Sequence, residues 1–477
     1  MTEEFTGRAV LVGGAGIAGR ACARALLALG AEVVVIDRAD SERLADLAAH
    51  GASTVVGEAP DPELLSQMDL VVVSPGYPPH HPLPAAALRA GIETYSEPEL
   101  AWRLRKPGPD GTPPPWLAIT GTNGKTTATT MLAAILKAAG LRADALGNVG
   151  QPLVDAVMRP AAEQFQAIAV ELSSFQLHWS AQLAPEAGAV LNLADDHLDW
   201  HGGFDRYAAA KDLIWRAPEG IAVGNADDPR VAALLAKAPG RQVGFTLSEP
   251  AYGQLGVVDG MLVDRGFADG LELISVRDLT PPGAHNVANA LAAAALARAY
   301  GVGVAAVRDG LAGYTPQPHR NQLVGHLDDV RFINDSKATN PHAAASSLAA
   351  YGGVVWIAGG QLKGVEVDEL VAGAARHLRG VVLIGEDRAR IAEALARHAP
   401  GVPVRDIDRT DDGAMAEAVE AARRLARPGD TVLLAPAAAS FDMFVNYGDR
   451  GEKFAAAVRG LSGARSGGAP ARRRAGR

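Results

Sequence analysis

Residues 116–127 read Trp-Leu-Ala-Ile-Thr-Gly-Thr-Asn-Gly-Lys-Thr-Thr, an apolar run that leads directly into a glycine turn. The apolar run predicts a buried strand, and residues 128–139 predict a helix. A strand, a glycine turn and a helix in this order make a phosphate-binding loop, in which backbone N–H groups and the helix N-terminus surround a phosphate. We therefore expect a parallel α/β sheet that binds a nucleoside triphosphate.

The turn contains the polar groups that this chemistry needs. Lys125 is expected to neutralise phosphate oxygens, and Thr126 is expected to hold Mg²⁺. The match is not the complete eight-residue P-loop, because Ile119 stands where its first glycine would be. The residues that we expect to contact ATP in this segment are Gly121, Thr122, Asn123, Gly124, Lys125, Thr126 and Thr127.

A second glycine turn lies upstream, in a stretch where apolar runs alternate with helical patterns as in a βαβ unit. It reads Gly-Ala-Gly-Ile-Ala-Gly at residues 14–19, and Asp37 ends the next apolar run, which fits a dinucleotide-binding fingerprint. Alone, this pattern is compatible with an NAD-dependent oxidoreductase or with a structural turn. The ATP loop downstream favours a nucleotide-sugar instead, whose diphosphate this turn would bind.

Changes in composition predict an α/β protein of three domains. A proline-rich linker at 107–115 separates an N-terminal Rossmann-like domain, residues 1–112, from a central P-loop domain, residues 113–314. An Asp-Gly pair at 259–260 predicts a small antiparallel excursion in the central domain. A further βα pattern predicts a C-terminal Rossmann-like domain, residues 315–461, followed by a disordered basic tail, residues 462–477.

Charge and hydropathy exclude some classes of protein. The net charge of −9 argues against a nucleic-acid binder, which needs a basic surface. The N-terminus carries acids where a secretory signal would be basic, and no long apolar run occurs, so we expect a cytoplasmic protein without membrane insertion. We also expect a monomer. The single cysteine, Cys22, is expected to be buried in a helix.

Two more strand ends carry potential metal ligands. Glu171 closes the apolar run 167–171, and residues 192–201 read Asn-Leu-Ala-Asp-Asp-His-Leu-Asp-Trp-His. Ligands of open α/β sheets bind beyond such strand ends. Carboxylates suit Mg²⁺, while histidine is a less usual ligand for it, so both a metal site and capping roles remain open on the residues alone.

These motifs together resemble the Mur ligase family. Its members share Gly-Thr-Asn-Gly-Lys-Thr, Glu-Xaa-Ser-Ser, Asn-Xaa-Xaa-Xaa-Asp-His and His-Asn-Xaa-Xaa-Asn, which stand here at 121–126, 171–174, 192–197 and 285–289. The resemblance covers nearly the whole chain and implies an ATP-dependent, Mg²⁺-requiring ligase of peptidoglycan synthesis. Segments 334–340 and 436–447 are similar to those of members that add D-glutamate to UDP-N-acetylmuramoyl-L-alanine. A relative that uses another amino acid or folate, and a nucleotide-binding regulator with a vestigial P-loop, are the alternatives.

The resemblance also implies roles for individual residues. Those implied to be catalytic are Lys125, His197 and Lys211. Those implied to surround the metal are Thr126, Glu171, His197 and Lys211. Those implied to complete the ATP site are Asn286, Asn289, Arg320 and Asp335. Those implied to contact the two other substrates are Gly16, Ile17, Asp37, Arg38, Ser74, Gly76, Asn148, Lys337, Thr339, Ser440, Phe441 and Tyr447. The chain departs from common family residues at Ala18, Arg38, Gln361 and Ala438.

Lys211 has two interpretations. Its local sequence, Tyr-Ala-Ala-Ala-Lys at 207–211, is typical of an exposed lysine on a helix. The resemblance matches it instead to the lysine that this family carbamylates with CO₂. The chemistry is consistent, because a neutral lysine takes up CO₂ and then presents a carboxylate that binds a cation.

Overall fold

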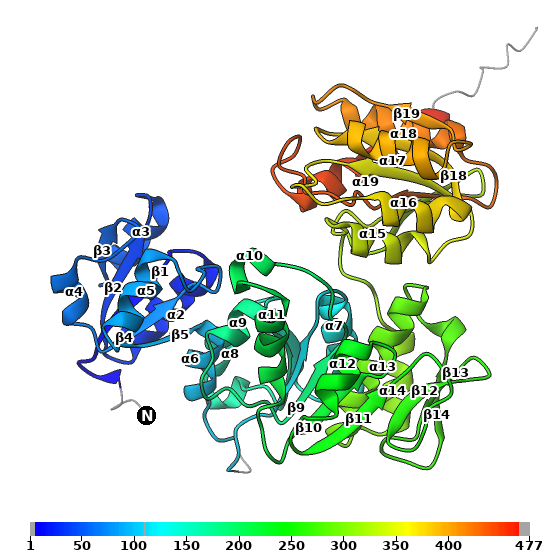
Figure 1. Ribbon diagram of the computed structural model, residues 1–477. Helices are drawn as coiled ribbons and strands as arrows, with labels where there is room; N and C mark the ends of the chain where they lie inside the picture. The colour runs from blue at the N-terminus through cyan, green and yellow to red at the C-terminus, as the bar shows by residue number, and fades with distance from the viewer. Residues whose placement is uncertain (1–4, 109–110, 467–477) are drawn as a thin grey trace, which may run out of the picture. The chain divides into compact units, whose positions relative to one another are not determined.

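The computed structural model describes residues 5–108 and 111–466 and contains three sheets, each covered by helices (Figure 1). The chain forms two compact units. The first comprises Met1–Leu279 with Asn286–Tyr314, and the second comprises Thr280–His285 with Thr315–Arg477. Because the first unit contains two of the three predicted domains, the boundary between residues 112 and 113 stays a prediction.

The first sheet is parallel throughout, with the strand order β3-β2-β1-β4-β5. Its strands are β1 (Ala9–Gly13), β2 (Glu32–Asp37), β3 (Ser53–Val56), β4 (Leu70–Val73) and β5 (Glu93–Ser96). Its helices are α2 (Ile17–Ala28), α3 (Glu42–Ala49), α4 (Pro62–Ser66), α5 (Pro82–Arg89) and α6 (Glu97–Arg103). The chain turns from one side of β1 to the other between β3 and β4, and ligands of such sheets bind at this switch point. The predicted Rossmann-like fold is confirmed.

The second sheet has the order β14-β13-β12-β11-β10-β9-β6-β8-β7. Its parallel strands are β6 (Trp116–Thr120), β7 (Ala143–Gly147), β8 (Ala167–Glu171), β9 (Ala187–Val190), β10 (Ile221–Asn225), β11 (Arg241–Phe245) and β12 (Gln254–Val258). Strands β13 (Met261–Asp264) and β14 (Leu271–Ser275) continue the sheet in antiparallel pairing. Asp259 and Gly260, with φ of 49° and 76°, form the tight turn between β12 and β13, which confirms the predicted hairpin.

Helices accompany the second sheet in the same first unit. They are α7 (Lys125–Ala138), α8 (Leu153–Val157), α9 (Ser174–His178), α10 (Leu198–His201), α11 (Phe204–Asp212), α12 (Pro229–Leu235), α13 (Ala284–Ala299) and α14 (Val304–Ala312). All residues of β6 and β8 are buried, as expected for central strands with helices on both faces. Cys22, on α2, is buried as predicted.

The third sheet, in the second unit, has the order β15-β16-β20-β17-β18-β19. It contains β15 (Gln322–Leu327), β16 (Val330–Asn334), β17 (Val354–Gly359), β18 (Leu378–Ile384), β19 (Val404–Asp406) and β20 (Thr431–Leu434), and only β15 is antiparallel to its neighbour. Its helices are α15 (Pro341–Leu348), α16 (Asp368–Ala374), α17 (Arg388–His398), α18 (Ala414–Leu425) and α19 (Tyr447–Ser466). Residues 462–466, expected to be disordered, form the end of α19, and the rest of the predicted tail lies outside the described residues.

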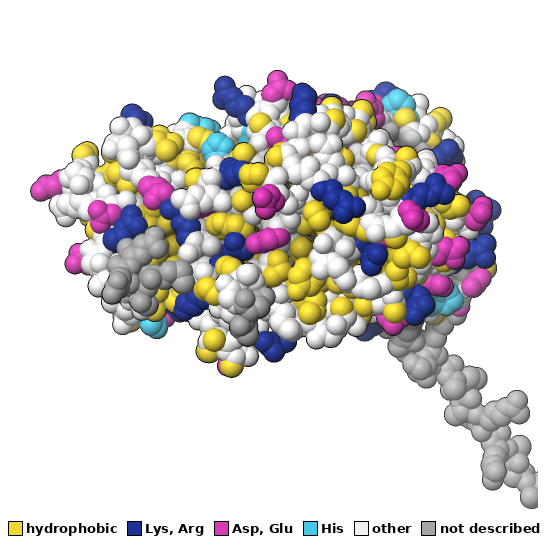
Figure 2. All heavy atoms as spheres, turned by 90° about the horizontal axis from the view of Figure 1, so that it is seen from below, with side chains coloured by type: hydrophobic (Ala, Val, Ile, Leu, Met, Phe, Trp, Pro, Cys, Tyr) yellow, Lys and Arg dark blue, Asp and Glu magenta, His cyan; other side chains and the backbone are white. Residues whose placement is uncertain are grey.

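One face of the molecule carries charges of both signs. On the face that Figure 2 shows, Lys and Arg lie interspersed with Asp and Glu and are not gathered into a basic patch. That face therefore lacks the basic stripe that phosphate backbones require. Within residues 5–108 and 111–466, no helix combines the length and the apolar character needed to cross a bilayer.

A buried carboxylate connects the first sheet's last helix to the central part of the first unit. Glu99, on α6, accepts backbone N–H groups of Ala181, Gln182 and Leu183 at 2.9–3.0 Å, and the Arg103 Nε at 2.9 Å. Its side chain is fully buried. Removal of this carboxylate would leave three backbone N–H groups, of which that of Leu183 is buried, and the Arg103 Nε without their acceptor.

Glu99→Ala is expected to lower the free energy of unfolding of the first unit by about 3–5 kcal/mol, as when one member of a buried pair is removed. Urea unfolding monitored by tryptophan fluorescence measures this loss. Glu93→Ala is the matched control, because Glu93 pairs with the same Arg103 at 2.8 Å but is largely exposed. That control is expected to change the free energy by less than about 1 kcal/mol. Equal losses in the two variants would contradict the role of Glu99.

Candidate active site

The glycine turn between β6 and α7 has a conformation that only glycine adopts readily. Gly121 and Gly124 have φ of 151° and 84°. A Cβ atom at Gly124 would also overlap the side-chain oxygen of Asn289, on α13. The turn backbone therefore lies against Asn289, whose amide nitrogen donates to Asn286 Oδ1 at 3.3 Å. The structure thus brings the two predicted ATP-site asparagines together beside the predicted phosphate loop.

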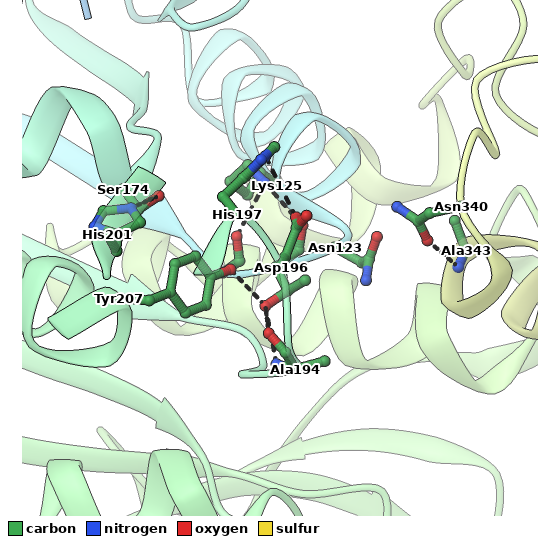
Figure 3. A network of polar contacts seen from close by, with 12 residues as sticks. Asn123, Lys125, Ser174, Ala194, Asp196, His197, His201, Tyr207, Asn340 and Ala343 are labelled. Carbon is green, nitrogen blue, oxygen red and sulfur yellow. Dashed lines mark hydrogen bonds and ion pairs between the residues drawn. The ribbon is translucent and has the colours of Figure 1, made fainter. Parts of the chain in front are cut away.

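The loop after β9 holds this turn in place. The Asn192 side chain accepts the Asn123 backbone N–H at 2.8 Å and donates to the Asn123 carbonyl at 3.0 Å. Thr122 Oγ1 lies 2.7 Å from the Tyr207 hydroxyl and accepts the Ala194 backbone N–H at 3.0 Å (Figure 3). These contacts fix the backbone of the turn from the side of the loop after β9.

Lys125 is the first residue of α7 and folds back over the turn. Its ammonium donates to the carbonyls of Gly121 and Thr122, both at 2.9 Å. The turn therefore combines a fixed positive charge with the backbone N–H groups at the start of α7. This is the arrangement that a triphosphate needs.

Thr126 and Glu171 meet one residue further along α7. Thr126 Oγ1 donates to Glu171 Oε2 at 2.6 Å, and Asn148 Nδ2 donates to the other carboxylate oxygen at 2.8 Å. Hydroxyl and carboxylate oxygens are ligands that Mg²⁺ prefers, usually together with phosphate oxygens and water. In the described part of the chain, no three His, Cys, Asp or Glu side chains gather as a metal cluster. The two oxygens fit a Mg²⁺ that is bound by nucleotide oxygens as well.

Lys211, on α11, is buried, so the interpretation of it as an exposed lysine is wrong. Its side chain is 2% exposed, and its ammonium donates to the Gly121 carbonyl at 2.8 Å. It also lies 4.8 Å from the centre of the Tyr207 ring. Burial, reinforced by the positive charge of Lys125, holds the pKa of Lys211 well below its usual range. The burial of Lys211 results from tertiary packing, because α11 places this side chain at the end of β6.

His197 stands at the start of α10 in a left-handed conformation, with φ of 53°. Such a backbone is uncommon for a residue other than glycine and is frequent at functional sites. Its Nε2 lies 3.5 Å from the Asp196 carboxylate (Figure 3). Its ring centre is 4.8 Å from that of Phe175. The side chain is half exposed, which leaves it accessible to a ligand.

At the switch point of the first sheet, Asp37 fixes the other glycine turn. Its Oδ2 accepts the Ala15 backbone N–H at 2.6 Å, and Gly14 has a φ of 93°. A Cβ at Gly19 would overlap the Gly14 carbonyl oxygen, so α2 packs closely against the turn. Asp37 is thus engaged by the protein itself, a contact that the sequence pattern did not predict.

The remaining residues predicted to contact the nucleotide-sugar surround that turn. Gly16 precedes α2, and Ile17, the first residue of α2, is 71% exposed. Ser74 follows β4, and its N–H donates to the Gly13 carbonyl. The Gly76 carbonyl accepts the Trp200 Nε1 of α10 at 3.1 Å. Arg38, next to Asp37, is exposed. The switch point therefore presents two loops that lie side by side, one of which also contacts α10.

In the second unit, Asp335 follows β16. Its Oδ1 accepts the Asn321 backbone N–H at 3.1 Å. Burial raises the pKa of Asp335 to about 6, and the positive charge of Arg320 acts in the opposite direction. The structure therefore brings together the two residues of this unit that were predicted to contact ATP.

The residues predicted to contact D-glutamate lie in three segments of the second unit. The Lys337 ammonium lies 3.9 Å from the centre of the Tyr447 ring. The Thr339 N–H donates to the Lys337 carbonyl, and Ser440 is buried. Phe441 is 66% exposed. Lys363 was not predicted, but its ammonium lies 5.9 Å from the centre of the Phe441 ring. This part of the chain therefore offers a cationic, aromatic environment.

Three family models match successive parts of the chain. Residues 8–96 match the MurD-like N-terminal domain, residues 119–297 the Mur ligase middle domain, and residues 319–438 the Mur ligase glutamate ligase domain. The chain is also 54% identical to the UDP-N-acetylmuramoylalanine--D-glutamate ligase of Streptomyces coelicolor, over 97% of this chain and 100% of that relative. The chain belongs to the Mur ligase family.

Other Mur ligases are also similar to this chain in sequence or structure. The enzyme of the same name from Mycobacterium avium is 50% identical over 95% of this chain and 96% of its own length. Among solved structures, UDP-N-acetylmuramate-alanine ligase MurC of Thermotoga maritima has a TM-score of 0.58 at 21% identity, over 97% of this chain and 100% of that one. MurF of Acinetobacter baumannii has a TM-score of 0.58 at 18% identity, over 96% and 92%. At such identities the two structures support the fold alone.

Tyr207 of this Mur ligase site was missed in the sequence, and His201 was considered only among the potential metal ligands of residues 192–201. Tyr207 carries the hydroxyl that contacts Thr122 and the ring that faces Lys211. His201 is buried, lies 2.9 Å from Ser174 Oγ through its Nε2, and has a pKa lowered to about 4 by burial. The spacing of Tyr207 and Lys211, four residues apart, could have indicated that they share a helix face. Nothing local indicated that His201 is buried.

Proposed function

We propose that this chain uses ATP to join D-glutamate to the carboxylate of UDP-N-acetylmuramoyl-L-alanine, releasing ADP and phosphate, as a step of peptidoglycan synthesis. The observation that carries the proposal is the Gly121–Thr126 loop with Glu171 and Lys211 beside it, in a chain 54% identical along its length to a ligase of that name. Because ATP is supplied in the cytoplasm, we assign the reaction to that compartment, with the chain acting as a monomer.

The chemistry requires ATP because a carboxylate at neutral pH is a poor acyl donor. In the proposed reaction, a carboxylate oxygen of the sugar-nucleotide attacks the γ-phosphorus of ATP, and ADP leaves. The amine of D-glutamate then attacks the acyl phosphate carbon, phosphate leaves and the nitrogen loses a proton. The Gly121–Lys125 turn would position the phosphates, and Lys125 would neutralise their developing charge.

We assign Mg²⁺ to Thr126 and Glu171, because these two oxygen ligands are in contact and lie at the phosphate loop. His197, exposed on the neighbouring loop, would complete the environment together with Lys211. The metal would supply positive charge to the phosphate oxygens. Asn148, which holds the other oxygen of Glu171, would then orient that carboxylate as well as touch the sugar-nucleotide.

Glu171→Gln is expected to raise the Mg²⁺ concentration for half-maximal activity by about 10- to 100-fold, because an amide keeps the shape and loses the charge. Magnesium titration of phosphate release measures this shift, and calorimetry of ATP binding with and without Mg²⁺ gives a readout that needs no turnover. Glu163→Gln, at an exposed glutamate, is the control. It is expected to leave the Mg²⁺ dependence of activity and the binding of ATP unchanged. An unshifted Mg²⁺ dependence in Glu171→Gln would contradict the assignment of Mg²⁺ to Glu171.

We also assign residues to the binding of the nucleotide-sugar, D-glutamate and ATP. The glycine turn with Gly16, Ile17 and Ser74 would bind the diphosphate of the nucleotide-sugar, since the start of α2 offers backbone N–H groups. Asp37, Arg38 and Gly76 border that turn. In the second unit, the residues assigned to D-glutamate are Lys337, Thr339, Ser440, Phe441 and Tyr447, and Arg320 and Asp335 are assigned to ATP.

Omission of single substrates tests the proposed function. Phosphate release is expected only when ATP, UDP-N-acetylmuramoyl-L-alanine and D-glutamate are all present, because the acyl phosphate forms on one substrate and is resolved by another. A panel of other amino acids and a folate acceptor separates the alternatives. Release that follows another acceptor, or tight ATP binding without any amino-acid-dependent release, would overturn the assignment.

A further inference from the structure

Arg450, on the first turn of α19, is a fully buried cation in the second unit. Its guanidinium donates from Nε to Ser336 Oγ at 2.9 Å, to the Ser336 carbonyl at 2.8 Å and to the Ala438 carbonyl at 3.1 Å. Among the described residues, no carboxylate forms an ion pair with it. Burial lowers the pKa of Arg450 to about 10, and the charge of Asp442 opposes this only in part.

The three acceptors belong to the loops that carry the proposed amino-acid site. Ser336 immediately precedes Lys337, and Ala438 lies two residues before Ser440. The Ser336 hydroxyl, which accepts from Arg450, donates in turn to the Tyr447 carbonyl at 2.7 Å. One guanidinium therefore links the loop after β16, the loop after β20 and the start of α19.

A structural role alone does not explain this choice of side chain. Taking a guanidinium out of water is unfavourable, and a buried cation without a carboxylate partner lacks the attraction that would offset it. Two properties are specific to arginine. Its planar fork reaches several oxygens at fixed angles, and it stays charged when buried. The charge matters if the neighbouring ligand is an anion, and D-glutamate carries two carboxylates.

We propose that Arg450 is a positioning residue for D-glutamate, holding the Lys337 and Ser440 loops at a fixed spacing and adding positive charge next to a dicarboxylate. The inference rests on the proposed function and deepens it. It predicts that Arg450 controls the KM for the amino acid, while the KM values for ATP and for the sugar-nucleotide stay the same.

Two substitutions separate the geometry from the charge. Arg450→Lys keeps the charge and loses the fork, so the KM for D-glutamate is expected to rise about 10-fold. Arg450→Met loses both, so the rise is expected to be about 100-fold. The control is Val419→Ala, a cavity variant in the buried face of α18, which destabilises the same unit and removes no hydrogen bond of these loops. It is expected to lower the melting temperature and to leave all three KM values unchanged.

The outcomes are distinguishable from those of the proposed function. If the wild-type chain shows no D-glutamate-dependent phosphate release, the proposed function fails. If the wild type is active, and Arg450→Met shows the KM values of Val419→Ala or raises all three together, the positioning role fails. If Arg450→Met does not fold, Ser336→Ala tests the positioning role. It removes one acceptor of the fork and is expected to raise only the KM for D-glutamate, by about 3-fold; an unchanged value overturns the inference.

Discussion

Lys125→Ala is expected to reduce kcat/KM by about 10³-fold or more, because transferring a phosphoryl group depends on neutralising charge that a single cation is placed to meet. The structure holds this ammonium over the glycine turn through the carbonyls of Gly121 and Thr122. Alanine removes the charge and leaves the backbone N–H groups of the turn in place. Turnover should therefore fall further than the affinity for ATP, which initial-rate kinetics and calorimetry measure separately.

Lys137→Ala is the matched control for Lys125. It lies on the same helix, α7, and makes an exposed ion pair with Asp144 at 2.9 Å. Its removal is expected to change kcat/KM by less than about 2-fold, since exposed ion pairs contribute little. Circular dichroism of both variants establishes that the fold is intact. Full activity in a folded Lys125→Ala protein would contradict the assignment of the phosphate loop.

The parts of the site that the sequence predicted are local in the chain. The glycine turn follows β6 and precedes α7 within twelve residues, so strand, turn and helix are encoded side by side, as is the hairpin at Asp259. Glu171 was predicted because a carboxylate ends an apolar run, and β8 lies next to β6 as such a site requires. For these residues, periodicity and turn chemistry decide the structure.

The parts that the sequence did not predict depend on contacts between distant segments. Lys211 is buried because α11 packs at the end of β6, about 90 residues earlier, and its local sequence carries no trace of this. Asp37 bonds Ala15, and Arg450 bonds Ser336, across 22 and 114 residues. Residues 462–466 are helical because they continue α19, although their composition is typical of a disordered segment. In each of these examples tertiary packing determines the structure, and the composition of the local segment does not indicate it.

A second large effect is expected at Lys211, which we propose to be carbamylated. Only a neutral amine adds CO₂, and a lysine with an ordinary pKa is almost entirely protonated near neutral pH. Because burial and Lys125 hold the pKa of Lys211 well below that range, a larger fraction of its amine is neutral than in an exposed lysine at the same pH. The product, a carbamate beside the Gly121 carbonyl, would place an anion where it can bind a cation.

Lys211→Met keeps the apolar stem and removes the amine, and it is expected to lower kcat by about 10²- to 10³-fold. In ¹³C-bicarbonate, the wild-type protein is expected to show one carbamate carbon resonance that Lys211→Met lacks and that Lys237→Met, altered at an exposed lysine, retains. The resonance should weaken on acidification, as the amine becomes protonated. A wild-type protein without this resonance would rule out the carbamate. A large loss of kcat in Lys211→Met would then assign the role to the amine itself, so the two measurements separate the modification from the residue.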